Sequence, residues 1–168
     1  QLPLMQMTYK QAMDDYGIDK PDLRFDMKLR NITDIGSASE FKVFVSVAQN
    51  GGIIKGLCAP GAASYSRSDI EKTLTEFVAN YGAKGLAWFK VVDEGKGPEL
   101  NSSIAKFFSD SQKQQIISQF QAKVGDLILM VADTEETTNK ALAALRCKLG
   151  KDLGLAKADA YKFLWVVD

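Results

Sequence analysis

The order of apolar patterns along the 168-residue chain is the feature that most limits its fold. Alternating or continuous apolar runs are typical of strands, and they predict strands over 41–47, 53–59, 84–92, 126–133 and 161–168. Apolar stripes of helical period predict helices over 8–16, 68–82, 111–123 and from an N-cap at Asp133 to about Leu153. This order predicts an α+β fold with helices on one face of a largely antiparallel sheet.

Turn and cap signals support several of these boundaries. Asn50-Gly51 is a hairpin signal between the first two predicted strands. Ser68 and Glu71 have the spacing of a capping box, which predicts a helix start at that point. Residues 95–109 are predicted to form a loop with a short apolar segment.

Composition excludes several classes of active site. The chain contains no histidine, so neither a Ser-His-Asp triad nor a Cys-His pair can be built from it. Histidine-containing zinc sites are excluded as well, and two isolated cysteines cannot form a structural zinc site. We interpret Cys58 and Cys147 as small core or helix-face residues, which suits a reducing compartment.

Other ligand-binding patterns are weak. The glycine-rich stretches "AQNGGIIKG" and "DEGKGP" lack the strand-to-helix placement of a phosphate-binding loop. "DTEETT" lacks the ligand spacing of a calcium loop and is better explained as a helix start. Trp88 is interpreted as a core side chain because it lies in a predicted strand. With 21 basic and 21 acidic residues, the chain has no general nucleic-acid footprint, although a local basic patch would escape this test.

A polar loop, "YGIDKPDLRFDMKL", follows the first predicted helix. Asp19, Lys20, Asp22 and Arg24 give it four charges in six residues. The loop is either a solvated connector with a surface ion pair or a docking loop that presents its charges to another part of the protein. Residue types alone do not decide between these two hypotheses.

Longer motifs resemble one family. "MTYKQAMDDYGIDKPDLRFDMKL" resembles the stretch after the second class-defining motif of bacterial-type, class II aspartyl-tRNA synthetases. "IIKGLCAPGAASYSRSDIEKTLTEFVANYGAKGLAWFKV" is similar to the first half of their insertion (GAD) domain, which the B subunit of the tRNA-dependent amidotransferase shares. "IAKFFS", "VGDLILMVAD", "ALAALRCKLGKDLGL" and "YKFLWVVD" resemble the rest, so the similarity runs from about Pro3 to Asp168. Phe108 departs from the pattern, where leucine is expected.

The resemblance implies a fold and a division of the chain. The expected insertion domain is a two-layer, DCoH-like β-β-α-β-β-α unit, with the helix at 111–123 as an addition. Residues 1–36 would connect it to the catalytic core, residues 37–157 would form the domain, and residues 158–168 would return to the core. The parent enzyme would be a cytoplasmic homodimer that joins aspartate to tRNA with ATP and magnesium. This part would be non-catalytic and would bind no cofactor or metal.

The resemblance also implies candidate sites. Asp19, Lys20, Asp22 and Arg24 would be ordered by the catalytic core, and Lys42, Lys55, Arg67, Lys84, Lys90 and Lys96 could contact the acceptor stem of tRNA-Asp. A purely structural module is the competing function. The amidotransferase B subunit is the alternative identity, although both flanking motifs argue against it.

Overall fold

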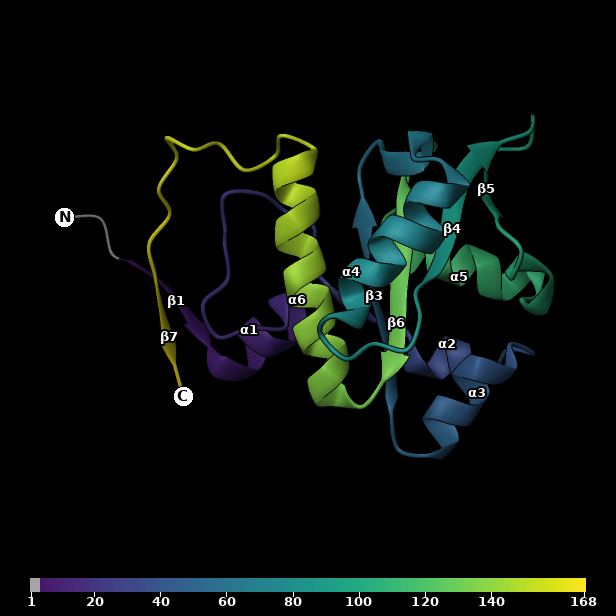
Figure 1. The fold of residues 1–168 in the computed structure, drawn as a ribbon, viewed down its shortest axis with the longest axis horizontal. Helices are drawn as coiled ribbons and strands as arrows, with labels where there is room; N and C mark the ends of the chain where they lie inside the picture. The colour runs from purple at the N-terminus through teal and green to yellow at the C-terminus, as the bar shows by residue number, and fades with distance from the viewer. Residues whose placement is uncertain (1–3) are drawn as a thin grey trace.

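A five-stranded antiparallel sheet forms the body of the protein, with strand order β2-β3-β6-β4-β5 (Figure 1). The computed structural model describes residues 4–168, so the first three residues of the predicted connector lie outside it. The strands are β2 (Arg30–Asn31), β3 (Ile53–Ala59), β4 (Ala87–Asp93), β5 (Pro98–Asn101) and β6 (Leu127–Asp133). The predicted α+β class and antiparallel sheet are confirmed, as are the strands expected over 53–59, 84–92 and 126–133.

The central strand β6 explains why its sequence is apolar without a break. It pairs with β3 on one side and with β4 on the other, in registers that include Leu57↔Leu129 and Trp88↔Leu129. Leu127 and Leu129 enter one core, and Ile128 and Met130 enter another on the opposite face. A strand covered on both faces needs apolar side chains at every position.

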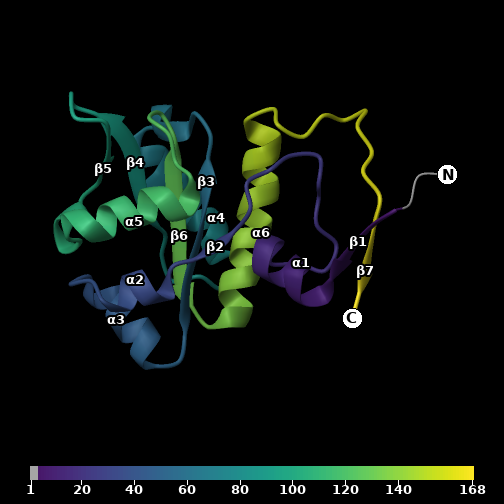
Figure 2. The same ribbon diagram turned by 180° about the vertical axis from the view of Figure 1, so that it is seen from behind.

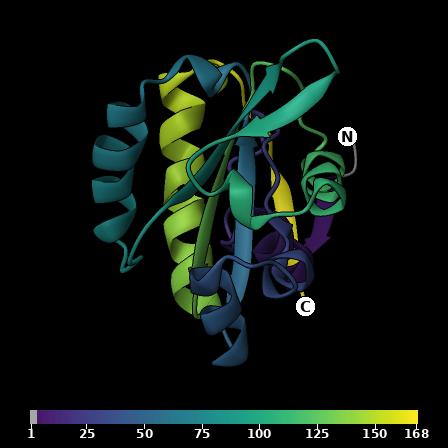
Figure 3. The same cartoon turned by 90° about the vertical axis from the view of Figure 1, so that its right-hand side faces the viewer.

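One face of the sheet carries α6 (Glu135–Asp152), the π-helix η2 (Asp69–Leu74) and α4 (Thr75–Ala79) (Figure 3). The predicted caps of these helices are shifted. Thr134, not Asp133, caps α6, because its side chain accepts a hydrogen bond from the Thr137 N–H at 3.3 Å. Ser68 makes no capping bond. Instead Ser66 and Asp69 exchange backbone-to-side-chain hydrogen bonds of 3.0 and 3.1 Å.

The other face is covered as well, which corrects the expectation of helices on one face only. It carries α2 (Thr33–Ser37), α3 (Lys42–Gln49) and α5 (Asp110–Phe120), and α5 confirms the helix predicted over 111–123. Two short 3₁₀ turns, η1 (Ala62–Ser64) and η3 (Ala105–Phe107), complete the connections. The body is therefore a sheet between two helical layers.

The strand predicted over 41–47 is wrong, because this segment forms helix α3. Phe41, Phe44 and Val47 follow one another at helical spacing, and Phe44 is buried against the sheet while Val43 is 55% exposed. The alternation of Val43, Val45 and Val47 therefore does not reflect a strand with one buried face. Asn50-Gly51 consequently ends a helix and does not close a hairpin.

The hairpin of the sheet lies elsewhere, between β4 and β5, inside the segment predicted to be a loop. The Asp93 carboxylate accepts hydrogen bonds from the N–H groups of Gly95 and Gly97 and so closes the turn. The expected β-β-α-β-β-α order is recovered if β2 is taken as the first strand: β2, β3, α4, β4, β6 and α6. α2, α3, β5 and α5 are then additions to that unit.

A second, two-stranded sheet stands apart from the body. β1 (Met5–Thr8) and β7 (Leu164–Val167) pair in parallel, and we call them the β1–β7 ribbon. Helix α1 (Tyr9–Tyr16) follows β1 directly, with the predicted stop at Gly17. α6 lies between this ribbon and the five-stranded sheet in both views (Figures 1 and 2). Among residues 4–168, no helix has the length and hydrophobicity needed to cross a membrane.

Candidate interaction surfaces

A buried arginine holds the polar loop that follows α1, which we call the lead-in loop (residues 17–29). Arg146 of α6 is 1% exposed. Its guanidinium donates to four backbone carbonyls of the loop, those of Asp22, Phe25, Asp26 and Met27, at 2.8–3.0 Å. The Tyr16 and Phe25 rings lie on the guanidinium, with centroids 4.6 and 4.2 Å from its carbon. The loop is thus attached to the body by contacts within the chain.

Lys55 of β3 makes a second buried attachment. It is 4% exposed, and its ammonium donates to the Met13 carbonyl at 2.9 Å and to Asn139 Oδ1 at 2.7 Å. Burial lowers the pKa of Lys55. Because this ammonium is enclosed between α1, α6 and β3, it is not available to a phosphate on an outer surface.

The four predicted docking residues have two kinds of surroundings. Asp22 and Arg24 bind each other through bonds of 2.6–3.1 Å, and Arg24 also donates to the Lys157 carbonyl. The hydrogen bond from Arg24 lowers the pKa of the Asp22 carboxyl. Asp19 and Lys20 are exposed and border a shallow hollow beside β7. A contact of these four residues with a catalytic core stays a prediction.

The remaining basic candidates come from several elements of the body. Lys90 donates to the Tyr65 carbonyl at 2.6 Å, and Arg67 pairs with Glu71 at 2.9 Å. Lys84 and Lys96 are exposed beyond opposite ends of β4, and a strand of that length spans roughly 20 Å. Lys42 is exposed at the start of α3, on a different element. A phosphate contact by any of these residues stays a prediction.

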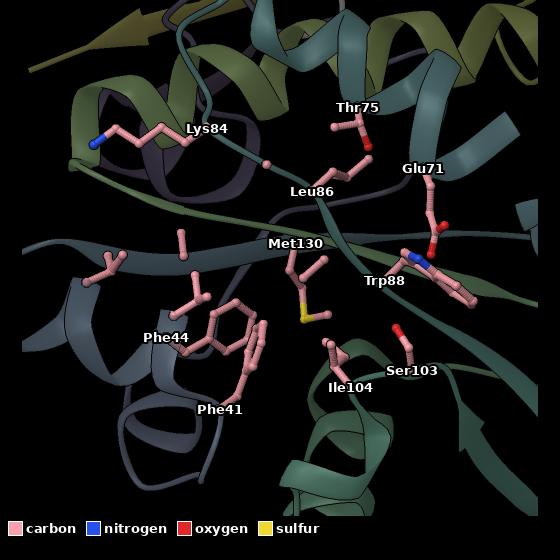
Figure 4. A pocket seen from close by; sticks show the side chains of 15 residues that line it. Phe41, Phe44, Glu71, Thr75, Lys84, Leu86, Trp88, Ser103, Ile104 and Met130 are labelled. Carbon is pink, nitrogen blue, oxygen red and sulfur yellow. The ribbon is translucent and has the colours of Figure 1, made fainter. Parts of the chain in front are cut away.

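An apolar groove of about 470 Å³ lies between α3, η2 and the segment that leads into β4 (Figure 4). Phe41, Leu86, Trp88 and Ile104 contribute apolar walls, and Met130 of β6 lines its floor. Trp88 is 8% exposed, which agrees with its interpretation as a core side chain. Sequence reasoning missed this groove because one of its walls is α3. The helical spacing of Phe41 and Phe44 was the signal that could have revealed it.

The β1–β7 ribbon exposes large apolar side chains. Within the ribbon, Met5 is 60% exposed and Trp165 is 61% exposed. Just before β7, Tyr161 is 79% exposed and Phe163 is 71% exposed. Tyr161 and Phe163 stack on each other with ring centroids 6.4 Å apart. An exposed apolar surface of this kind is typical of an interface with further protein.

The two cysteines have surroundings that disfavour the thiolate. Burial and the neighbouring Asp126 raise the pKa of Cys58 to about 12. Burial also raises the pKa of Cys147, although part of that residue is exposed. Among residues 4–168, no group of three or more His, Cys, Asp or Glu side chains is arranged to hold a metal ion.

Comparison with known proteins identifies the family. The profile of the GAD domain matches residues 44–142, from within α3 to within α6. The chain belongs to the GAD domain family. The matched part of this GAD domain contains β3, β4, β5 and β6, and the lead-in loop and β1–β7 ribbon lie outside it.

Full-length relatives extend the similarity across the whole chain. The GAD domain protein is 51% identical over 167 residues to the aspartate–tRNA ligase of Macrococcus caseolyticus, with 99% of this chain and 27% of the relative aligned. It is 51% identical over 170 residues to the aspartate–tRNA(Asp/Asn) ligase of Bacillus subtilis, covering 100% of this chain and 28% of the relative. The chain therefore spans little more than a quarter of the length of these relatives.

Proposed function

We propose that this chain is the insertion domain of an aspartate–tRNA ligase and that it serves that enzyme as a structural, positioning module. Similarity to such ligases over 99–100% of the chain supports this origin. The parent enzyme, a cytoplasmic homodimer, would join aspartate to tRNA-Asp with ATP and magnesium. Its ATP and aspartate sites would lie outside residues 1–168, so the chain by itself would be inactive.

The β1–β7 ribbon is the observation that carries the proposal. An isolated two-stranded sheet is marginal in water, and parallel strands are normally covered on both faces. This ribbon nevertheless exposes Trp165 at 61%, and the adjoining Phe163 is 71% exposed. The remainder of the ligase would extend the ribbon into a larger sheet and cover these side chains. Everything between β1 and β7 would then be an insertion that leaves and re-enters the catalytic core through neighbouring strands.

A structural role is favoured over direct contact with RNA. Lys55 is enclosed, Arg67 is paired with Glu71, and Lys90 is bound to a backbone carbonyl. Lys84 and Lys96 lie beyond opposite ends of one strand. With a net charge of zero, any binding of tRNA by the isolated domain would be weak and salt-dependent.

The alternative identity, a GAD domain from an amidotransferase B subunit, is less favoured. The lead-in loop and the ribbon lie outside the region that matches the GAD profile. The alignments to the two ligases include both of these flanks, because they cover 99–100% of the chain. The flanks therefore favour a ligase over an amidotransferase subunit.

A chimera tests the proposed origin. The segment of the Bacillus subtilis ligase that aligns with this chain is replaced by residues 1–168, and aspartylation of tRNA is measured. We expect the chimera to retain most of the activity. A matched chimera with the same segment in scrambled order should lose it. A correctly folded chimera without activity would contradict the proposal.

Titration with RNA separates the structural role from an RNA-binding one. A labelled tRNA-Asp acceptor minihelix is titrated with the purified chain at low and moderate salt. We expect no saturable binding. Competed, salt-sensitive binding that is lost in a Lys42, Lys84 and Lys96 triple alanine variant would overturn the structural role. A control variant with alanine at Lys123, Lys140 and Lys151 should then bind like the unmodified chain.

A further inference from the structure

Two buried cations of the body, Arg146 and Lys55, are unusual in having no carboxylate partner. They are 1% and 4% exposed, and none of the ion pairs among residues 4–168 includes either of them. Buried charges in proteins are normally paired with an opposite charge. Here the partners are neutral acceptors: backbone carbonyls and one amide oxygen.

Nearly all of these acceptors belong to the same stretch of chain. Lys55 reaches the carbonyl of Met13 in α1, and Arg146 reaches four carbonyls between Asp22 and Met27. Both cations therefore extend from the body into the segment that joins β1 to the body. Apolar packing accompanies these bonds, because Ala12 and Tyr16 of α1 and Met27 and Leu29 of the lead-in loop are buried. The polar bonds add a specific geometry, because each hydrogen bond requires its acceptor in a set direction.

The Arg146 contacts define an orientation as well as a position. The guanidinium is a flat group with donors in a fixed fork, and it is enclosed by the Tyr16 and Phe25 rings. Met27, whose carbonyl accepts from Nε, has a backbone φ of 79°, which residues other than glycine rarely adopt. Such a conformation persists where its surroundings impose it. Any rotation of the segment would leave buried donors unpaired, which is costly.

We infer that Arg146 and Lys55 are positioning residues that hold α1 and the lead-in loop, and with them the β1–β7 ribbon, in one fixed orientation to the five-stranded sheet. The junction is a rigid joint and not a hinge. In the proposed ligase, which this last consequence assumes, the insertion domain stands at a set angle to the catalytic core.

Gly150 allows this joint to be disturbed without removing a charge. A methyl group added at Gly150 of α6 would collide with the Phe25 ring, which covers Arg146. Alanine is a better helix former than glycine, so Gly150→Ala favours α6 while it displaces Phe25. If this contact served stability alone, every variant that changes the orientation would also lower the melting temperature.

Distance measurements between spin labels test the joint. Labels are placed at exposed helical positions on its two sides, Lys10→Cys in α1 and Gln115→Cys in α5, in a chain with Cys58→Ala and Cys147→Ser. We expect one narrow distance distribution. Arg146→Met and Lys55→Met should each broaden the distance distribution at least twofold. Arg146→Lys should also broaden the distribution, because a single ammonium cannot replace the donors of the guanidinium. Gly150→Ala should broaden the distribution without lowering the melting temperature. Lys140→Met, at an exposed position of α6, is the matched control and should change nothing.

The outcomes are distinct. If Arg146→Met does not fold, the Gly150→Ala and Arg146→Lys variants decide the question. Folded variants that keep the narrow distribution would overturn the inference, as would a broad distribution in the unsubstituted chain. In the chimeric ligase, a looser joint should raise the KM for tRNA several-fold and leave aspartate-dependent ATP–pyrophosphate exchange unchanged. An inactive chimera would contradict the proposed function, whereas the distances measured in the isolated chain would still decide the joint.

Discussion

The two tryptophans of the chain stand in two regions that are held together differently. Trp88 is 8% exposed in β4 of the five-stranded sheet, whereas Trp165 is 61% exposed in β7 of the ribbon. Both residues lie in strands and pair with a residue of the neighbouring strand, Trp88 with Leu129 and Trp165 with Gln6. The difference is in side-chain burial: the body carries a core on each face of its sheet, and the ribbon carries none.

This contrast indicates that the contacts that stabilise the body differ from those that set the position of the ribbon. The body can be stable by itself because helices cover both faces of its sheet. The ribbon depends on α1, on pairing between its own two strands and, as we propose, on further protein that covers its aromatic side chains. Between the body and the ribbon, the hydrogen bonds of Arg146 and Lys55 add directional contacts to the apolar packing of Met27 and Leu29. The comparison predicts that substitutions in the body, in the joint and in the ribbon have effects that differ in magnitude and in the property affected.

The largest effect is expected for Trp88→Ala. This side chain contacts the core formed with α6, and truncation of a buried tryptophan typically costs about 3–5 kcal/mol. Unfolding by urea, followed by circular dichroism, should show a large decrease in the midpoint. A loss below about 1 kcal/mol would mean that the core around β4 is not continuous.

Gly17→Ala should have the next largest effect, because it acts at the joint itself. Gly17 has a φ of 70°, and an added methyl group would lie 2.6 Å from the Asn139 carbonyl oxygen. Left-handed strain and this collision should together cost about 1–3 kcal/mol. Gly85→Ala is the matched control, since nothing lies within 4 Å of an added methyl group there. Equal stabilities of the two variants would contradict a tight contact between α1 and α6.

Much of the body could be predicted from the sequence, because its signals are local. The stripe of α6 has the length and period of a helix, and the short apolar run of β6 lies between Gly125 and the helix start at Thr134, which favours a strand. The segment 41–47 was mispredicted because Val43, Val45 and Val47 alternate, while the deciding fact is tertiary: only Phe44 is fully buried. In such short apolar runs, periodicity alone does not separate helix from strand.

The joint could not be predicted at all, because no local pattern encodes it. Arg146 lies in "ALAALRCKLGK", where it has the spacing of an ordinary helix residue, and its partners are backbone carbonyls more than 100 residues away. A backbone acceptor has no residue type and leaves no signature in the sequence. The charges of the polar loop are visible in the sequence, but its attachment to α6 appears only in three dimensions.

A smaller effect is expected for the Asp22–Arg24 pair, at low pH. Because Arg24 lowers the pKa of Asp22 in the folded protein, the unfolded chain binds the proton more readily. The pair therefore contributes stability above the ordinary carboxyl pKa of about 4, and this contribution is lost as the pH falls through the lower folded value. Solvent screening limits it to less than about 1 kcal/mol, since both side chains are partly exposed.

Urea unfolding at pH 6 and at pH 3 measures this contribution. Asp22→Asn should reduce the acid-induced loss of stability, whereas Asp159→Asn should not, because Asp159 is exposed and forms no ion pair among residues 4–168. If both variants respond to acid like the unsubstituted chain, the pair contributes nothing to the attachment of the lead-in loop.

The smallest effect in the isolated chain is expected for Trp165→Ala, and it completes the comparison with Trp88. A side chain that is 61% exposed gives up little burial, so the free energy of unfolding should change by no more than about 0.5 kcal/mol. In the chimeric ligase the same substitution should lower the melting temperature measurably, because the proposed catalytic core would cover this residue. A large effect in the isolated chain would mean that the ribbon is already buried without the core. No effect in either protein would leave its exposed aromatic surface without the partner that we propose.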